Sequence, residues 1–127
     1  MYLDTDIILA LIKPSDWLRP HVALNKITDP RTSVFALAEA ELILEREFGR
    51  NELPDMLGKI RKLKIRIENV TEVVIEKNLE MLKKYPDLRI FDSIHAAFCY
   101  VHKEKIISTD HVYDDIKEIE RIDPRNL

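Results

Sequence analysis

The chain has 127 residues, of which 46% are hydrophobic and 34% charged, and this composition is typical of a folded domain rather than a disordered chain. The net charge of −3 argues against binding nucleic acid through bulk positive charge, although a bound divalent metal can reverse the local field. The single cysteine, Cys99, excludes a disulfide framework and favours a reducing cytoplasm. The longest apolar run, Ile7 to Ile12, is too short for a membrane span and follows two aspartates, unlike a signal peptide.

Predicted strands and helices alternate along the chain. We predict short strands at residues 2–5, 31–34, 64–70, 105–109 and 121–123. We predict helices at residues 6–13, from Ser15 or Asp16 to residue 25, and at 35–48, 53–63, 72–85, 91–103 and 112–119. Strands that alternate with helices form a parallel sheet covered on both faces, so we expect one α/β domain over residues 1–127.

Acidic residues follow two of the predicted strands. Asp4 closes the first strand, and Asp110 closes the strand K-I-I-S-T-D. Asp92 begins the helix F-D-S-I-H-A-A, near the edge of the sheet where helices start. Open α/β sheets bind ligands beyond the carboxyl ends of their strands. Glu39 lies in an apolar stripe of its helix, but Glu41 also has apolar neighbours, so periodicity does not choose between the two.

Each acid also has a purely structural interpretation. For Asp92 and Asp110 taken singly, a helix cap is the favoured one. Glu39 can become neutral or reach solvent along its stem. Asp6 starts a helix, so capping is favoured there too. Asp4, at a buried strand end with no cap to make, is the hardest acid to explain structurally.

Taken together, Asp4, Glu39, Asp92 and Asp110 would converge at one edge of the sheet. Two like charges at ~4 Å repel by about 1 kcal/mol in water and about 4 kcal/mol near a protein surface. Converging carboxylates therefore require protonation or a cation, and all-oxygen ligand sets suit Mg²⁺ or Mn²⁺ rather than zinc. Such a site favours metal-assisted hydrolysis of phosphodiester bonds.

Four sequence blocks occur in the order D-T-D-I-I-L, T-S-V-F-A-L-A-E, F-D-S-I-H-A-A and I-I-S-T-D-H-V-Y. In sequence and order these blocks resemble the PIN domain family, and within it the small VapC-type toxin ribonucleases. The resemblance implies a three-layer α/β/α fold with a central parallel sheet of four to five short strands. It also implies a Mg²⁺- or Mn²⁺-dependent ribonuclease that forms homodimers and is inhibited by a VapB-type antitoxin.

The resemblance also assigns residues, and it selects Glu39 over Glu41. It implies a catalytic quartet in which the three aspartates hold the metal, directly or through water. Ser108 stands where the family usually has a Thr or Ser beside the site, Tyr113 where it has an aromatic, and Asp6 where it often has Asn. In the hypothetical mechanism, the hydroxyls of Ser108 and Thr5 orient water or phosphate oxygens, and Asp6 is a further supporting residue. Val112 occupies a position that is often acidic, so the resemblance favours one metal over two. The implied quartet is Asp4, Glu39, Asp92 and Asp110.

Two further patterns have competing interpretations. Five basic residues between Lys59 and Arg66 would suit an RNA-tracking face, but a solvated helix face is favoured. His95, Cys99 and His102 have the spacing of a zinc site, but helical His and Cys beside small apolar residues usually pack in the core.

Two other functions compete with the ribonuclease. D-T-D also resembles the nucleophile motif of haloacid-dehalogenase-type phosphatases, in which Asp4 would be phosphorylated and Asp6 would act as acid and base. That motif does not explain Glu39 or Asp92. A non-catalytic PIN-like module that binds RNA or a protein would be indicated by loss of one of the four acids, and all four are present.

Overall fold

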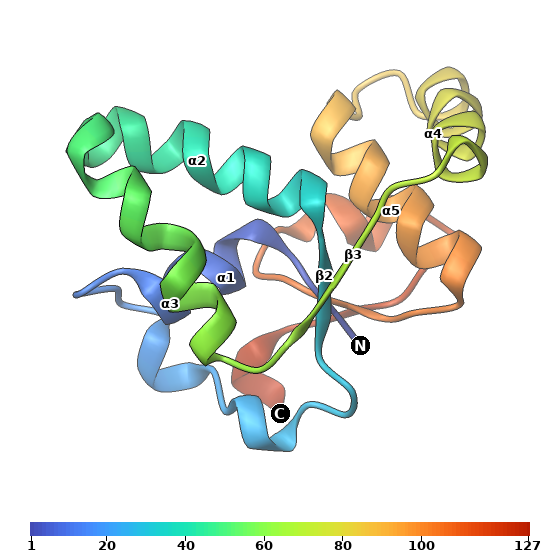
Figure 1. The fold of residues 1–127 in the computed structure, drawn as a ribbon. Coiled ribbons are helices and arrows are strands. Elements are labelled where there is room, and N and C mark those ends of the chain that lie inside the picture. Colours follow the sequence, from blue (N-terminus) through green and yellow to red (C-terminus); the bar gives the residue numbers. More distant parts are fainter.

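The computed structural model describes residues 1–127 and contains a five-stranded sheet in which every pairing is parallel. The strand order is β3-β2-β1-β4-β5, so the first strand of the chain is the central one. Helices flank this sheet (Figure 1), which confirms the predicted α/β class and the five short strands. The strands are β1 (Tyr2–Leu3), β2 (Arg31–Ser33), β3 (Arg66–Glu68), β4 (Ile106–Ile107) and β5 (Arg121–Ile122).

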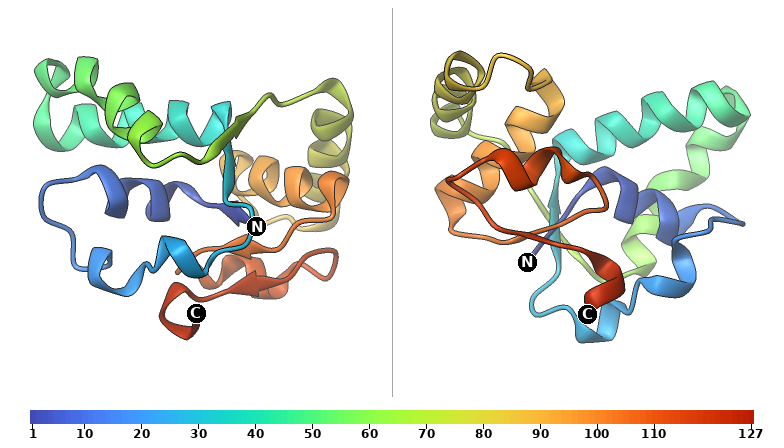
Figure 2. Two further views of the ribbon diagram at one scale, coloured as in Figure 1. Left: turned by 60° about the horizontal axis from the view of Figure 1, so that its bottom comes forward. Right: turned by 180° about the vertical axis from the view of Figure 1, so that it is seen from behind.

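Five α-helices connect the strands, each close to its predicted position: α1 (Thr5–Ile12), α2 (Val34–Phe48), α3 (Met56–Lys62), α4 (Glu72–Lys84) and α5 (Ile90–His102). Gly49 ends α2 with a φ of 81°, a conformation that favours glycine. The helices form two groups, with α2 and α3 together at one side of the molecule and α4 and α5 at the other (Figure 2). No helix is both long and apolar enough to span a membrane.

Two predicted helices were wrong. The segment up to residue 25 forms two short 3₁₀ turns instead, η1 (Arg19–His21) and η2 (Leu24–Lys26), and Pro20 in the first turn has no N–H to support an α-helix. The segment from residue 112 forms only the 3₁₀ turn η4 (His111–Asp115). The chain then becomes extended at Ile116, whose side chain is buried in the core below α5.

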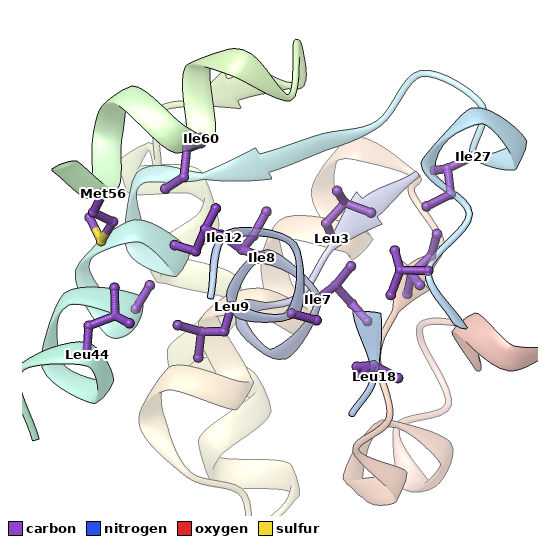
Figure 3. Close-up of a cluster of buried hydrophobic side chains, with 14 residues drawn as sticks. Leu3, Ile7, Ile8, Leu9, Ile12, Leu18, Ile27, Leu44, Met56 and Ile60 are labelled. Atoms are coloured by element: carbon purple, nitrogen blue, oxygen red, sulfur yellow. The ribbon is translucent and has the colours of Figure 1, made fainter. Parts of the chain in front are cut away.

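The core lies on both faces of the central strand. Because consecutive strand residues point to opposite faces, Leu3 and Tyr2 belong to different hydrophobic clusters. Leu3 lies in the cluster around α1, which is covered by α2 and α3 (Figure 3). Tyr2 lies in the cluster of α4 and α5. The strand that carries Asp4 at its end is therefore buried on both sides and held rigidly in place.

Candidate active site

The strand order changes direction at β1, because β2 and β3 extend the sheet on one side and β4 and β5 on the other. Asp4 follows β1 directly, and Asp110 lies shortly after β4, the neighbouring parallel strand. Ligands bind beyond the carboxyl ends of parallel strands at such a switch point. The predicted positions of Asp4 and Asp110 at the same edge of the sheet follow from this pairing.

Asp4 is only 6% exposed and caps α1. Its Oδ1 accepts a hydrogen bond from the Thr5 N–H at 2.8 Å, and its Oδ2 accepts one from the Ser108 hydroxyl at 2.7 Å. The expectation that Asp4 has no cap to make was therefore wrong, because α1 begins one residue earlier than predicted. Burial raises the pKa of Asp4 to about 6, although His95 nearby opposes the shift.

Asp92 and Asp110 differ in the hydrogen bonds that their carboxylates accept from the protein. Asp110 is the N-cap of η4, and its Oδ1 accepts a hydrogen bond from the Val112 N–H at 2.9 Å. Asp92 is not a cap, because α5 begins after Arg89 and the Asp92 carboxylate accepts no hydrogen bond from the protein. Burial raises the pKa of Asp92, and the negative charges of Asp110 and Glu39 raise it further.

Asp6 lies in the first turn of α1 and does not cap it, so that prediction was also wrong. Its Oδ2 accepts hydrogen bonds from the backbone N–H and the hydroxyl of Thr109, at 2.8 and 2.6 Å. Its other oxygen, Oδ1, is buried without a partner. Burial raises the pKa of this carboxyl, while the bonds from Thr109 oppose the shift. Asp6 thereby fastens the segment that leads into Asp110.

Glu39 faces the aspartates from α2, whereas Glu41 is exposed. The Oε1 atom of Glu39 lies 3.0 Å from Nε2 of His95, which is fully buried on α5. Burial raises the pKa of Glu39, but the hydrogen bonds to His95 and Thr5 and the charge of His95 together outweigh burial and hold this pKa below its usual value. The pKa of His95 is raised, because its contacts with Glu39 and Asp4 outweigh burial.

His95 was not predicted as a residue of the site, because the sequence pattern was interpreted as core packing. A signal was present, because His95 stands one helical turn after Asp92 on the same helix. The zinc pattern is not supported, since Cys99 is buried in the hydrophobic core and His102 is exposed against Phe98. The groups that could together hold a metal are instead Asp4, Glu39 and His95, whose ligand atoms lie within 4.8 Å of one another.

The acids line one open cleft of about 410 Å³. Arg89 is its only basic lining residue and forms no ion pair with an acid. Thr5 contributes to the wall, and its hydroxyl lies 3.5 Å from Nε2 of His95. Ser108 is fully buried behind the wall. Carboxylate oxygens are the donor set that suits a hard divalent cation. The lining residues are Asp4, Thr5, Asp6, Leu9, Glu39, Ile43, Arg89, Asp92, Thr109 and Asp110.

The basic cluster between Lys59 and Arg66 lies elsewhere. None of its members lines the cleft. The helix α3 leads into the amino end of β3, so Lys62 and Lys64 lie at the opposite edge of the sheet from the acids (Figure 1). The interpretation of a solvated face fits this position better than an RNA track into the cleft.

Comparisons with known proteins agree with this fold. A family model of the PIN domain matches residues 1–119. FitAcB from Neisseria gonorrhoeae has a similar structure, with a TM-score of 0.77 and 21% identity over 99% of both chains. VapC20 from Mycobacterium tuberculosis, a sarcin-ricin loop cleaving toxin, has a TM-score of 0.75 and 18% identity over 94% of this chain and 96% of its own. A toxin-antitoxin complex from Klebsiella pneumoniae has a TM-score of 0.69 and 15% identity, over 97% and 96% of the two chains.

At these identities, the solved structures show a shared fold and no more. The search of the curated proteins found no match to this sequence. The family model spans the strands β1 to β4 and all the acids of the cleft. The chain belongs to the PIN domain family.

Proposed function

We propose that the protein is a Mg²⁺- or Mn²⁺-dependent endoribonuclease that hydrolyses phosphodiester bonds in RNA. One observation carries the proposal: Asp4, Glu39, Asp92 and Asp110, from four separate segments, line one cleft, and neither Asp92 nor Asp110 forms an ion pair with a basic side chain. Such a concentration of negative charge repels RNA unless a cation is bound. The membership of the PIN domain family supports the same activity.

In this proposal Asp4, Asp92 and Asp110 hold the metal, and Glu39 completes the acidic wall. When bound, a divalent metal supplies a water of lowered pKa and neutralises charge that develops on the phosphate. The Ser108 hydroxyl donates to Asp4 and accepts from the Asp110 N–H at 3.0 Å, so one side chain sets the spacing of two ligands. Thr5 presents a hydroxyl that orients water or phosphate oxygens beside them.

We further propose that the protein is the cytoplasmic toxin of a type II toxin-antitoxin system, active as a homodimer and inhibited by a VapB-type antitoxin. The support is the set of structural neighbours, which includes the complex from Klebsiella pneumoniae and VapBC2 from Rickettsia felis bound to a promoter DNA fragment. Expression of the protein alone is expected to arrest growth, and co-expression with a cognate VapB-type antitoxin is expected to yield a stable complex and to relieve that arrest.

The phosphatase alternative fits the geometry less well. Both oxygens of Asp4 accept hydrogen bonds from within the protein, and Asp6 is bound to Thr109 rather than free to act as acid and base. A fluoride analogue of phosphate distinguishes the two functions, because only a phosphatase would trap it on Asp4.

The test of the ribonuclease is a crystal soaked in Mn²⁺. We expect anomalous density between Asp4, Asp92 and Asp110, and Mn²⁺-dependent cleavage of labelled RNA that EDTA abolishes. Asp92→Asn should lose both, whereas Glu41→Gln, which changes an exposed acid on the same helix as Glu39, should lose neither. An empty site at saturating Mn²⁺ would overturn the proposal.

A further inference from the structure

His95 contacts two acids of the site from a fully buried position in α5. Its Nε2 atom lies 3.0 Å from Oε1 of Glu39 and 3.7 Å from Oδ1 of Asp4. On the other side of the ring, Nδ1 lies 2.6 Å from the hydroxyl oxygen of Tyr2. Both ring nitrogens are therefore engaged by protein groups, which raises the question of whether either can bind a metal.

The hydrogen between His95 and Glu39 belongs to the histidine. An ionised carboxylate only accepts hydrogen bonds, so the 3.0 Å contact requires a hydrogen on Nε2. A ring nitrogen that carries a hydrogen has no lone pair to give to a metal. Although Asp4, Glu39 and His95 offer ligand atoms within 4.8 Å of one another, one of these three atoms is thus occupied as a donor.

The contacts of His95 continue into a closed circuit. The Tyr2 hydroxyl lies 2.7 Å from the Ser33 hydroxyl. Ser33 is the N-cap of α2, the helix that carries Glu39, and accepts from the Ala36 N–H at 3.4 Å. Tyr2, Ser33 and His95 are all fully buried, so water does not compete for these bonds. The Ser33–Tyr2–His95–Glu39 circuit ties α2 to β1 and α5 and fixes the direction of Glu39.

We propose that His95 is a positioning residue that holds the Glu39 carboxylate by a hydrogen bond and is not a metal ligand, so that the divalent cation is held by Asp4, Asp92 and Asp110. The inference rests on the proposed function for the presence of the metal. It agrees with the oxygen preference of Mg²⁺ and Mn²⁺. It gives Glu39 the role of a fixed charge beside the metal rather than a bond to it.

Calorimetric titration with Mn²⁺ tests the proposal through binding rather than activity. In His95→Gln we expect the Kd for Mn²⁺ to change by less than about threefold, while kcat for RNA cleavage falls about 10- to 100-fold, as for outer partners of metal ligands. KM should stay nearly constant. Cys99→Ala is the matched control, because Cys99 is buried on the same helix one turn further and makes no polar contact with the site; it should change neither quantity. Weaker Mn²⁺ binding by more than about tenfold in His95→Gln alone would show that His95 contributes to binding of the metal and would overturn the proposal.

A second measurement needs no substitution of His95. In the ¹⁵N-histidine-labelled protein, long-range ¹H–¹⁵N spectra should show a hydrogen on Nε2 that persists at saturating Mg²⁺. Tyr2→Phe should shift the Nδ1 resonance and lower kcat by about 3- to 10-fold. Loss of the Nε2 hydrogen on Mg²⁺ binding would overturn the proposal. If the wild-type protein binds no divalent metal, the proposed function is wrong. The spectrum of the metal-free protein still tests the circuit, because an Nε2 atom without a hydrogen in that spectrum would refute the hydrogen bond to Glu39.

Discussion

The protein gathers carboxylates in two places, at opposite ends of the strands of one sheet. The cleft lies at the carboxyl ends of β1 and β4. The second group, which we call the arginine cluster, surrounds Arg31 and Arg66, the first residues of β2 and β3. There Arg31 lies 2.6 Å from Asp29 and 3.0 Å from Glu104, and Arg66 lies 2.8 Å from Asp29.

The buried aspartates of the cleft and Asp29 of the arginine cluster have pKa values shifted in opposite directions, whereas Glu39, which is bound to His95, resembles Asp29. In the arginine cluster the hydrogen bond from Arg31 lowers the pKa of Asp29. In the cleft, burial and neighbouring acids raise the pKa of Asp4 and of Asp92. Aspartate is thus structural at Asp29, where arginines supply the positive charge, and has a raised pKa at Asp4, where burial outweighs the effect of the nearby His95. An acid cluster becomes informative about function only when the partners of each carboxylate have been counted.

The largest expected effect follows from removing one charge of the cleft. Asp4→Asn should lower metal-dependent cleavage by about 1,000-fold or more, because loss of a ligand exceeds the 10- to 100-fold cost of losing an outer partner. Asparagine caps helices as well as aspartate does, so the free energy of unfolding of the metal-free protein should fall by no more than about 1 kcal/mol. If the folded variant retained cleavage, Asp4 would not be a catalytic residue. Cleavage assays and urea unfolding together separate the two outcomes.

The pH dependence of stability should reveal the unbalanced charge. Because the folded pKa of Asp4, about 6, exceeds the ordinary value of 3.8, the folded metal-free chain binds more protons between these pH values. Its stability relative to Asp4→Asn should therefore fall as the pH rises from about 4 to 6, by roughly 3 kcal/mol at 1.36 kcal/mol per pKa unit. Urea unfolding with EDTA measures this difference. If the stability of the two proteins had the same pH profile, burial would not destabilise the charged form of Asp4. Mn²⁺ at 100 times its Kd should raise the free energy of unfolding of the wild-type protein by about 2.7 kcal/mol at pH 7.

The arginine cluster should respond in stability alone. Arg31 is only 16% exposed and touches three acids, so Arg31→Met should cost about 2 kcal/mol, between the values for surface and buried ion pairs. Arg66→Met, at 54% exposure, should cost about 0.5 kcal/mol or less. Cleavage per folded molecule should not change in either variant. A loss of cleavage would show that the two regions are coupled.

An effect on cleavage that is smaller than that of Asp4→Asn is expected from the contact between Asp6 and Thr109. Thr109→Val keeps the backbone N–H bond but removes the 2.6 Å hydroxyl bond, which loosens the segment before Asp110. We expect kcat/KM for cleavage to fall about tenfold, as for other partners that orient metal ligands. Thr71→Val, at an exposed threonine whose side chain caps nothing, is the control. Equal activity in both variants would leave Asp6 without a positioning role.

The sequence predicted the alternation of strands and helices and placed four acids at one edge, because strand ends and helix starts are local features. It did not predict the partners of those acids. The start of α1 at Thr5 rather than Asp6 moved the cap to Asp4 and freed Asp6 to bind Thr109, about a hundred residues away. His95 was missed for the same reason, since its contacts with Tyr2 and Glu39 depend on how α5 is rotated against the sheet. Periodicity does not determine that rotation.

The 104-residue separation between Asp4 and Ser108 has a consequence for synthesis. A ribosome makes Asp4 and Glu39 early, and domains begin to fold from the amino terminus as they emerge. Until β4 pairs with β1, Asp4 lacks Ser108 and the cleft lacks Asp110. A nascent chain therefore has an incomplete acid set and lacks the complete site of the proposed ribonuclease. The order of the residues along the chain thus delays formation of the complete cleft until β4 and Asp110 have been made.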